Sequence, residues 1–170
     1  MSNNVVITGA NRGIGLAMCM HFKAQGDKVF ALCRNSSTDL EELNVNVIEG
    51  IDVASDIGVE NMVAALSNVD IDVLVCNAGI LRDESLSQLN VDTIREQFEI
   101  NALAPLRVVA TLQANLNEGA KVALITSRMG SISDNTSGGR YGYRMSKAAL
   151  NAAAMSLSHD LASKKIAVGI

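Results

Sequence analysis

The sequence predicts an α/β domain in which helices cover both faces of a parallel sheet. Short apolar runs, typical of buried strands, alternate along the chain with longer segments whose apolar residues recur at helical spacing. The first apolar run also ends directly in a glycine-rich turn that opens a helix. The chain has 170 residues and neither an internal repeat nor a low-complexity linker, so we expect a single domain over residues 1–170.

Each element of this fold follows from its local pattern. Strands are predicted where apolar runs stand between turn signals, at 5–8, 28–33, 45–48, 72–76, 120–126 and 165–170. Helices are predicted at 14–25, 56–66, 89–116 and 143–163, where the apolar positions have helical spacing. Pro105 lies inside the third of these helices and predicts a kink there, or a tolerated bend, rather than two helices. Residues 127–139 are rich in Ser, Gly, Asn and Asp and predict a loop.

Composition and charge exclude several function classes. Apolar residues make up 48% and charged residues 19%, which indicates an ordered globular chain. The formal net charge of −4 gives no electrostatic case for nucleic acid or an anionic membrane surface as a partner. No run of 18 apolar residues predicts a membrane span, and residues 1–7 do not read as a secretion signal. The cysteines (Cys19, Cys33 and Cys76) lack metal-ligand spacing, so we expect reduced thiols, no metal site and a cytoplasmic protein.

The glycine turn at 8–15 has the context of a dinucleotide-binding site. It lies between the first predicted strand and the first predicted helix, whose N-terminus offers free N–H groups to a pyrophosphate. Gly9 allows the tight turn, Gly13 lets the backbone approach the phosphates, and Gly15 lets the helix pack close to the strand.

Five short motifs follow one another in a defined order. They are Thr-Gly-x-x-x-Gly-x-Gly at 8–15, Asn-Ala-Gly at 77–79, Asn101, Ser127 at the end of the fifth predicted strand, and Tyr-x-x-x-Lys at 143–147. Together they resemble the short-chain dehydrogenase/reductase family over nearly the whole chain. The run 141–151 is most similar to its C-factor-like or sniffer-like carbonyl reductase branch. The resemblance implies a Rossmann-type, doubly wound sheet with strand order 3-2-1-4-5-6.

Tyr143 and Lys147 form the predicted catalytic pair. They are four residues apart on one helix face, and an ammonium favours the phenolate form of a nearby tyrosine. Tyr143 can then exchange a proton with a carbonyl or alcohol oxygen. Tyr141 has Met145 at the corresponding position, so we expect it to be a packing residue.

The resemblance assigns further roles at the site. Ser127 would hold the substrate oxygen, Asn101 would anchor a water that relays protons, and Lys147 would also bind the nicotinamide ribose. Because the loop after Ser127 is long, Ser131 and Ser133 are rivals for its role; Ser127 is preferred because it directly ends the strand. The predicted cofactor-binding residues are Thr8, Gly9, Asn11, Arg12, Gly13, Ile14, Gly15, Arg34, Asp52, Val53, Asn77, Ala78, Gly79, Tyr143 and Lys147.

The end of the second predicted strand favours NADP over NAD. An acidic residue there would bind the ribose 2′-hydroxyl and repel a 2′-phosphate, whereas this chain has Arg34, with Arg12 in the glycine turn. By resemblance, Asp52 would contact the adenine. The paired acids Asp83 and Glu84 are expected to be solvated surface charges.

Two functions are compatible with these residues. The first is an NADP(H)-dependent oxidoreductase that moves a hydride between nicotinamide and a small carbonyl or alcohol substrate. The second is a weakly catalytic nucleotide-binding or signalling module of the same fold, because the family's substrate loop and final strand would follow residue 170 and we expect a truncated chain. The resemblance also implies a homodimer or homotetramer held by the helices at 89–116 and 143–163.

Overall fold

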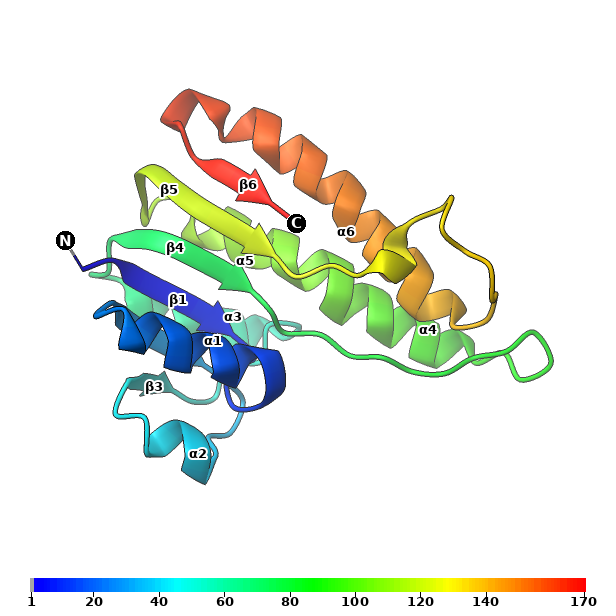
Figure 1. Cartoon of the computed structure of the whole chain (residues 1–170), viewed down its shortest axis with the longest axis horizontal. Coiled ribbons are helices and arrows are strands. Elements are labelled where there is room, and N and C mark those ends of the chain that lie inside the picture. Colours follow the sequence, from blue (N-terminus) through cyan, green and yellow to red (C-terminus); the bar gives the residue numbers. More distant parts are fainter. Residues whose placement is uncertain (1) are drawn as a thin grey trace.

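The chain folds around one parallel sheet. The computed structural model describes residues 2–170 and contains six strands in the order β3-β2-β1-β4-β5-β6, each parallel to its neighbours (Figure 1). The predicted strand order is therefore confirmed. The strands are β1 (Asn4–Thr8), β2 (Lys28–Leu32), β3 (Asn46–Ile48), β4 (Ile71–Cys76), β5 (Leu116–Leu124) and β6 (Ala167–Gly169). The α-helices are α1 (Gly13–Ala24), α2 (Thr38–Glu41), α3 (Asp56–Leu66), α4 (Val91–Phe98), α5 (Ala104–Leu112) and α6 (Tyr141–Asp160).

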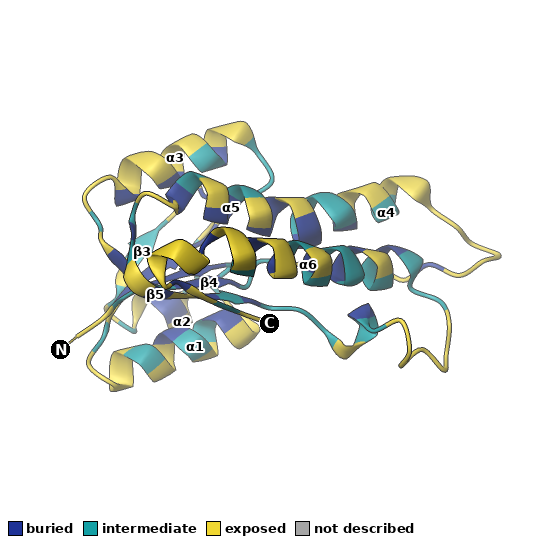
Figure 2. Ribbon diagram, turned by 90° about the horizontal axis from the view of Figure 1, so that it is seen from above, coloured by how far each residue is buried: buried dark blue, intermediate teal, exposed yellow. Residues whose placement is uncertain are grey.

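Helices cover both faces of the sheet, so its strands are buried on both sides. Figure 2 shows α1 and α2 beneath one face and α3, α5 and α6 above the other. Alternate β1 residues serve the two cores: Val6 packs with residues of α3, α5 and α6, whereas Val5 and Ile7 pack on the α1 side. Burial on both faces explains why these strands read as continuous apolar runs rather than as an alternation.

The predicted helix at 89–116 extends too far at its C-terminal end, and its irregular segment does not lie at Pro105 as predicted. The helical path runs from α4 through a π-helical segment, Glu99–Leu103, into α5, and β5 already begins at Leu116. The irregular turn precedes Pro105, which lies in the first turn of α5. Proline is tolerated in the first turn of a helix, because the backbone N–H groups there have no α-helical acceptor and the missing N–H of proline costs no such hydrogen bond.

The structure also differs from the predicted elements in three short segments, each too short to show a periodic apolar pattern. Helix α2 was not predicted, because four residues carry no periodicity; Ser37 caps it by accepting from the Leu40 N–H at 3.3 Å. Helix α6 begins at Tyr141, two residues before the predicted start. A short 3₁₀ turn, Arg128–Gly130, lies inside the predicted loop at 127–139.

The topology sets where a ligand can bind. All six strands point their carboxyl ends at the same edge of the sheet (Figure 1). Strands β2 and β3 are added on one side of β1 and strands β4 to β6 on its other side, so the strand order reverses between β1 and β4. In open α/β sheets, ligands bind outside the carboxyl ends of the strands at such a switch point.

Candidate active site

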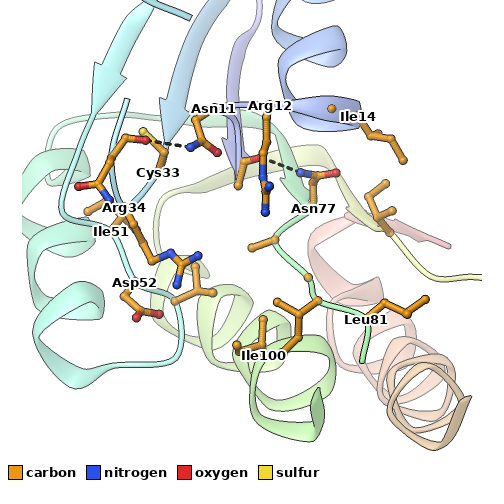
Figure 3. A pocket seen from close by; sticks show the side chains of 18 of the residues that line it. Asn11, Arg12, Ile14, Cys33, Arg34, Ile51, Asp52, Asn77, Leu81 and Ile100 are labelled. Atoms are coloured by element: carbon orange, nitrogen blue, oxygen red, sulfur yellow. Dashed lines mark hydrogen bonds between the residues drawn. The ribbon is translucent and has the colours of Figure 1, made fainter. Parts of the chain in front are cut away.

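A cavity of about 730 Å³ opens at this switch point. Its walls come from the β1–α1 turn, the end of β2, residues 51–53, the segment 77–81 after β4, residues 125–126 after β5, and the first turns of α6 (Figure 3). Segments from across the whole sequence therefore meet at one place.

The β1–α1 turn needs two of its glycines because the backbone is crowded there. A Cβ on Gly9 would lie 2.8 Å from Ala78 Cα, and a Cβ on Gly15 would lie 2.3 Å from the Gly9 carbonyl oxygen. Gly13 differs, because a Cβ there would meet nothing within 4 Å and its φ is +56°. It lines the open cavity, so its bare backbone leaves the approach to the α1 N-terminus clear.

Hydrogen bonds join β1 to β4 where the cavity begins. The Thr8 hydroxyl accepts from the backbone N–H groups of Asn77 and Ala78, both at 3.1 Å. In return, the Asn77 side-chain amide donates to the carbonyls of Thr8 and Gly9, both at 3.0 Å. Thr8 is buried below the cavity, so it shapes the floor rather than lining the space.

Two arginines stand at the end of the cavity next to β2. Arg12 reaches in from the glycine turn and Arg34 from the residues after β2, and both are exposed (Figure 3). Asn11 donates its side-chain amide to the Asn35 carbonyl at 3.0 Å and so joins the two segments that carry these arginines. Cys33, which directly precedes Arg34, also lines this end of the cavity, and the pKa of its thiol is raised by burial and by the charge of Glu49.

Tyr143 and Lys147 line the opposite wall from successive turns of α6. The Lys147 ammonium lies 5.7 Å from the centre of the Tyr143 ring and donates to the Ile125 carbonyl at 2.7 Å. Burial lowers the pKa of Lys147 from its ordinary 10.5 to about 8. The ammonium form therefore still predominates at neutral pH.

Asn101 is buried directly behind this wall, in the π-helical segment. It clasps Ile80 by accepting from its N–H and donating to its carbonyl, both at 2.8 Å, and it also donates to the Ser146 hydroxyl at 3.1 Å. It does not line the cavity; a Cβ on Gly79 would lie 3.2 Å from its Oδ1, so Gly79 separates the two.

Ser127 lies just beyond the cavity lining. Its hydroxyl accepts from the Met129 N–H at 3.1 Å and caps the short 3₁₀ turn, while its neighbour Thr126 lines the cavity. Ser131 and Ser133 share a hydrogen bond of 3.3 Å in the following loop and do not line the cavity either.

Most of the predicted cofactor residues thus converge, and four site residues lie around them. Thirteen line the cavity: Gly9, Asn11, Arg12, Gly13, Ile14, Arg34, Asp52, Val53, Asn77, Ala78, Gly79, Tyr143 and Lys147. Thr8, Gly15, Asn101 and Ser127 lie behind or beside its wall. Sequence reasoning missed eight lining residues, namely Cys33, Asn35, Ile51, Ile80, Leu81, Ile100, Ile125 and Thr126. All but Ile100 follow a strand end, which was the available signal.

Within residues 2–170, no three His, Cys, Asp or Glu side chains are grouped so that they could hold a metal ion. No helix in this range has the length and apolarity needed to cross a membrane.

Comparison with known proteins identifies the family. The model of the short chain dehydrogenase family matches residues 3–170. The chain belongs to this family. It is 40% identical over 168 residues to 1-hydroxy-2-glutathionyl-2-methyl-3-butene dehydrogenase from Rhodococcus sp. (strain AD45), covering 98% of this chain and 74% of that relative. It is 49% identical over 94 residues to C-signal from Myxococcus xanthus, covering 54% of this chain and 57% of that relative.

Solved structures agree with this assignment. A short-chain dehydrogenase/reductase from Burkholderia multivorans with bound NADP superposes with a TM-score of 0.90 at 30% identity, over 99% of this chain and 77% of that one. The fold is thereby established for the chain, and membership of the family supports oxidoreduction with a nicotinamide cofactor as its coarse activity.

The crowding at Gly15 leads to a stability prediction. Gly15→Ala should lower the free energy of unfolding by about 1–3 kcal/mol, because the added methyl group meets backbone that cannot move aside. Urea unfolding measures this. The matched control is Gly169→Ala, whose methyl group meets nothing within 4 Å. Equal stabilities of the two variants would contradict the packing argument.

The buried ammonium leads to a pH prediction. Between about pH 8 and pH 10.5 the folded chain has lost the Lys147 proton that the unfolded chain still holds, so this residue's contribution to stability rises with pH in that window. The free energy of unfolding of the parent minus that of Lys147→Met should therefore increase from pH 7 to pH 10.5. Lys121→Met, which removes an exposed lysine, is the control against which this increase is compared. A flat difference for Lys147 would contradict the burial effect.

Proposed function

We propose that the chain is an NADP(H)-dependent oxidoreductase that transfers a hydride between nicotinamide and a small carbonyl or alcohol substrate. The observation that carries this proposal is that Tyr143 and Lys147 line the same cavity as the glycine turn. A proton donor with an ammonium beside it and a phosphate-binding turn are the two halves that such a reaction needs.

The residues of the cavity fit a dinucleotide. Gly13 leaves bare backbone at the α1 N-terminus, where a pyrophosphate would receive N–H groups. The two arginines at the β2 end carry the charge that a 2′-phosphate requires, and Asp52 lies half-buried near them. Lys147, at the other end, would hold the ribose next to the nicotinamide.

The proton side of the reaction belongs to α6. The bound cofactor supplies or accepts the hydride. During reduction Tyr143 donates its hydroxyl proton to the substrate oxygen, and during oxidation it removes that proton. The Lys147 ammonium favours the phenolate that Tyr143 becomes. Ser127, or Thr126 beside it, would hold the substrate oxygen from the β5 side.

Pro105 supports a role for Asn101 in supplying protons. An α-helix would satisfy the Asn101 carbonyl with the N–H of residue 105, but proline has none. The Asn101 carbonyl therefore has no α-helical donor at the end of the π-helical segment 99–103. We propose that a water bound there relays protons to Lys147.

The substrate class is drawn from the family and one relative. The Rhodococcus relative is named as a dehydrogenase of a hydroxylated compound, which supports an alcohol or carbonyl group as the reacting centre. Self-association would use the outer faces of α5 and α6, where Leu106, Met145 and Met155 are exposed, together with the exposed Leu103 at the end of the π-helical segment. We propose a homodimer or homotetramer on that basis.

A second candidate is a nucleotide-binding module with a signalling role. The similarity to C-signal favours it, over about half of the present chain. A chain of this second kind would bind NADPH without oxidising it in the presence of aldehydes and ketones.

Cofactor preference tests the arginine assignment. We expect the dissociation constant for NADPH to lie below that for NADH. Arg34→Asp should reduce the ratio of the NADH constant to the NADPH constant by about tenfold or more, since hydrogen bonds to charged groups are worth about 1.5–3 kcal/mol. Isothermal titration with each cofactor measures this. The control Arg95→Asp makes the same charge change at an exposed position on α4. Equal affinities of the parent for the two cofactors would refute the NADP assignment.

Turnover tests the choice of tyrosine. Tyr143→Phe should reduce NADPH oxidation by about a hundredfold or more, while cofactor affinity stays close to that of the parent, because the lost hydroxyl is the proton donor and contributes little to cofactor binding. Tyr141→Phe is the matched control, since Tyr141 does not line the cavity. A greater loss in Tyr141→Phe would show that the proton donor has been misassigned.

A further inference from the structure

Glu84 is a buried carboxylate that the reaction above does not use. The sequence predicts a solvated charge at this position, and the structure corrects that prediction: Glu84 is 4% exposed. One carboxylate oxygen accepts from the side chains of Gln97 and Thr93, and the other accepts from the backbone N–H of Gly142 at 3.3 Å. A carboxylate so enclosed needs several donors, and here they come from α4 and α6.

Gln97 completes the connection on the α4 side. It is fully buried, and its side-chain oxygen accepts from the Arg82 N–H at 2.9 Å. Its side-chain nitrogen donates to Glu84 and to the Thr93 carbonyl. The loop after β4 is therefore held to α4 at two points, residues 82 and 84.

The start of α6 depends on Glu84 for its hydrogen-bond acceptors. Arg140 precedes the helix with a φ of +53°, and its side chain provides no cap. Its backbone N–H donates to the Glu84 carbonyl at 2.8 Å, while the Glu84 side chain accepts from Gly142. Glu84 thus caps a 20-residue helix from 58 residues earlier in the chain, with its negative charge at the helix N-terminus.

Gly142 is matched to this arrangement. A Cβ there would lie 2.4 Å from the Gln97 side-chain nitrogen and 3.0 Å from a Glu84 carboxylate oxygen. The glycine therefore provides the space that the two buried side chains fill.

Gln97 and Asn101 are four residues apart and connect the same three elements: α4 with its π-helical extension, the loop after β4, and α6. Each amide binds the backbone of the loop after β4, Gln97 at Arg82 and Asn101 at Ile80. Each also reaches α6, Gln97 through Glu84 to Gly142 and Asn101 directly to Ser146. Tyr143 lies between these two attachment points.

We infer that Glu84 and Gln97 are positioning residues that hold the first turn of α6, and with it Tyr143, against the cavity. The effect on catalysis rests on the proposed function, since it matters only if Tyr143 is the proton donor. The effect on the helix turn does not rest on it.

Exchanging the two side chains tests the pair. Glu84→Gln places two side-chain amide donors together, and Gln97→Glu places two carboxylates together. The double variant restores one donor and one acceptor. Glu96→Gln is the control. Glu96 lies on α4 next to Gln97, but its exposed carboxylate pairs with the Arg82 side chain outside the buried cluster.

Hydrogen exchange and kinetics are the two measurements on the NADPH-bound chain. Each single variant should speed amide exchange of residues 141–147 by about tenfold or more and leave residues 4–8 and 150–160 within about twofold of the parent. Turnover should fall by about tenfold with little change in the KM for NADPH, because Tyr143 is misplaced while Lys147 keeps its hydrogen bond to the Ile125 carbonyl. The double variant should recover part of both losses, since a carboxylate at position 97 can again accept from the Arg82 N–H but cannot donate to the Thr93 carbonyl, and Glu96→Gln should match the parent.

Three results would overturn the inference. They are unchanged exchange at 141–147 in the single variants, a parallel rise in all three segments, or no recovery in the double variant. If the parent itself does not oxidise NADPH with any carbonyl compound, the proposed function fails, and the exchange data alone decide whether the pair holds the helix turn.

Discussion

The site depends first on the hydrogen-bonded joint between β1 and β4. After β1 the chain continues toward β2 on one side of the sheet, and after β4 it continues toward β5 on the other side. Without hydrogen bonds between them, the loops that follow β1 and β4 would not be held together. Thr8 and Asn77 provide that joint through four hydrogen bonds that involve backbone on both sides. The glycine turn, the loop after β4 and the helices that follow are all built outward from it, and the cavity is the space between them.

Sequence reasoning succeeded where a pattern repeats or a conformation is demanding. The continuous apolar runs gave six parallel strands, since burial on both faces requires them. The spacing of Gly9, Gly13 and Gly15 placed the tight turn between β1 and α1, because few residues tolerate its contacts and backbone angles, while its cofactor-binding role stays a prediction. Tyr143 and Lys147 were found because four-residue spacing brings side chains together on a helix.

It failed where the partner of a residue is distant in sequence. Glu84 looks like a surface acid because its neighbours in the sequence are polar, and only the folded chain brings Gln97 and Gly142 to it. The π-helical turn at 99–103 was hidden because its apolar spacing still resembles that of an α-helix, and Pro105 drew attention to the wrong turn. The separation of Ser127 from the cavity reflects the 3₁₀ turn that it caps, which has no periodic signal.

The distant cap on α6 also bears on the order in which the molecule acquires its structure. The middle of α6 carries its own helical hydrogen bonds and can form early, as local structure does. Its first turn gains acceptors only when a segment 58 residues earlier has docked on α4. The end of the helix that faces the cavity is therefore completed only together with that docking, so an ordered Tyr143 depends on a contact made far away along the chain.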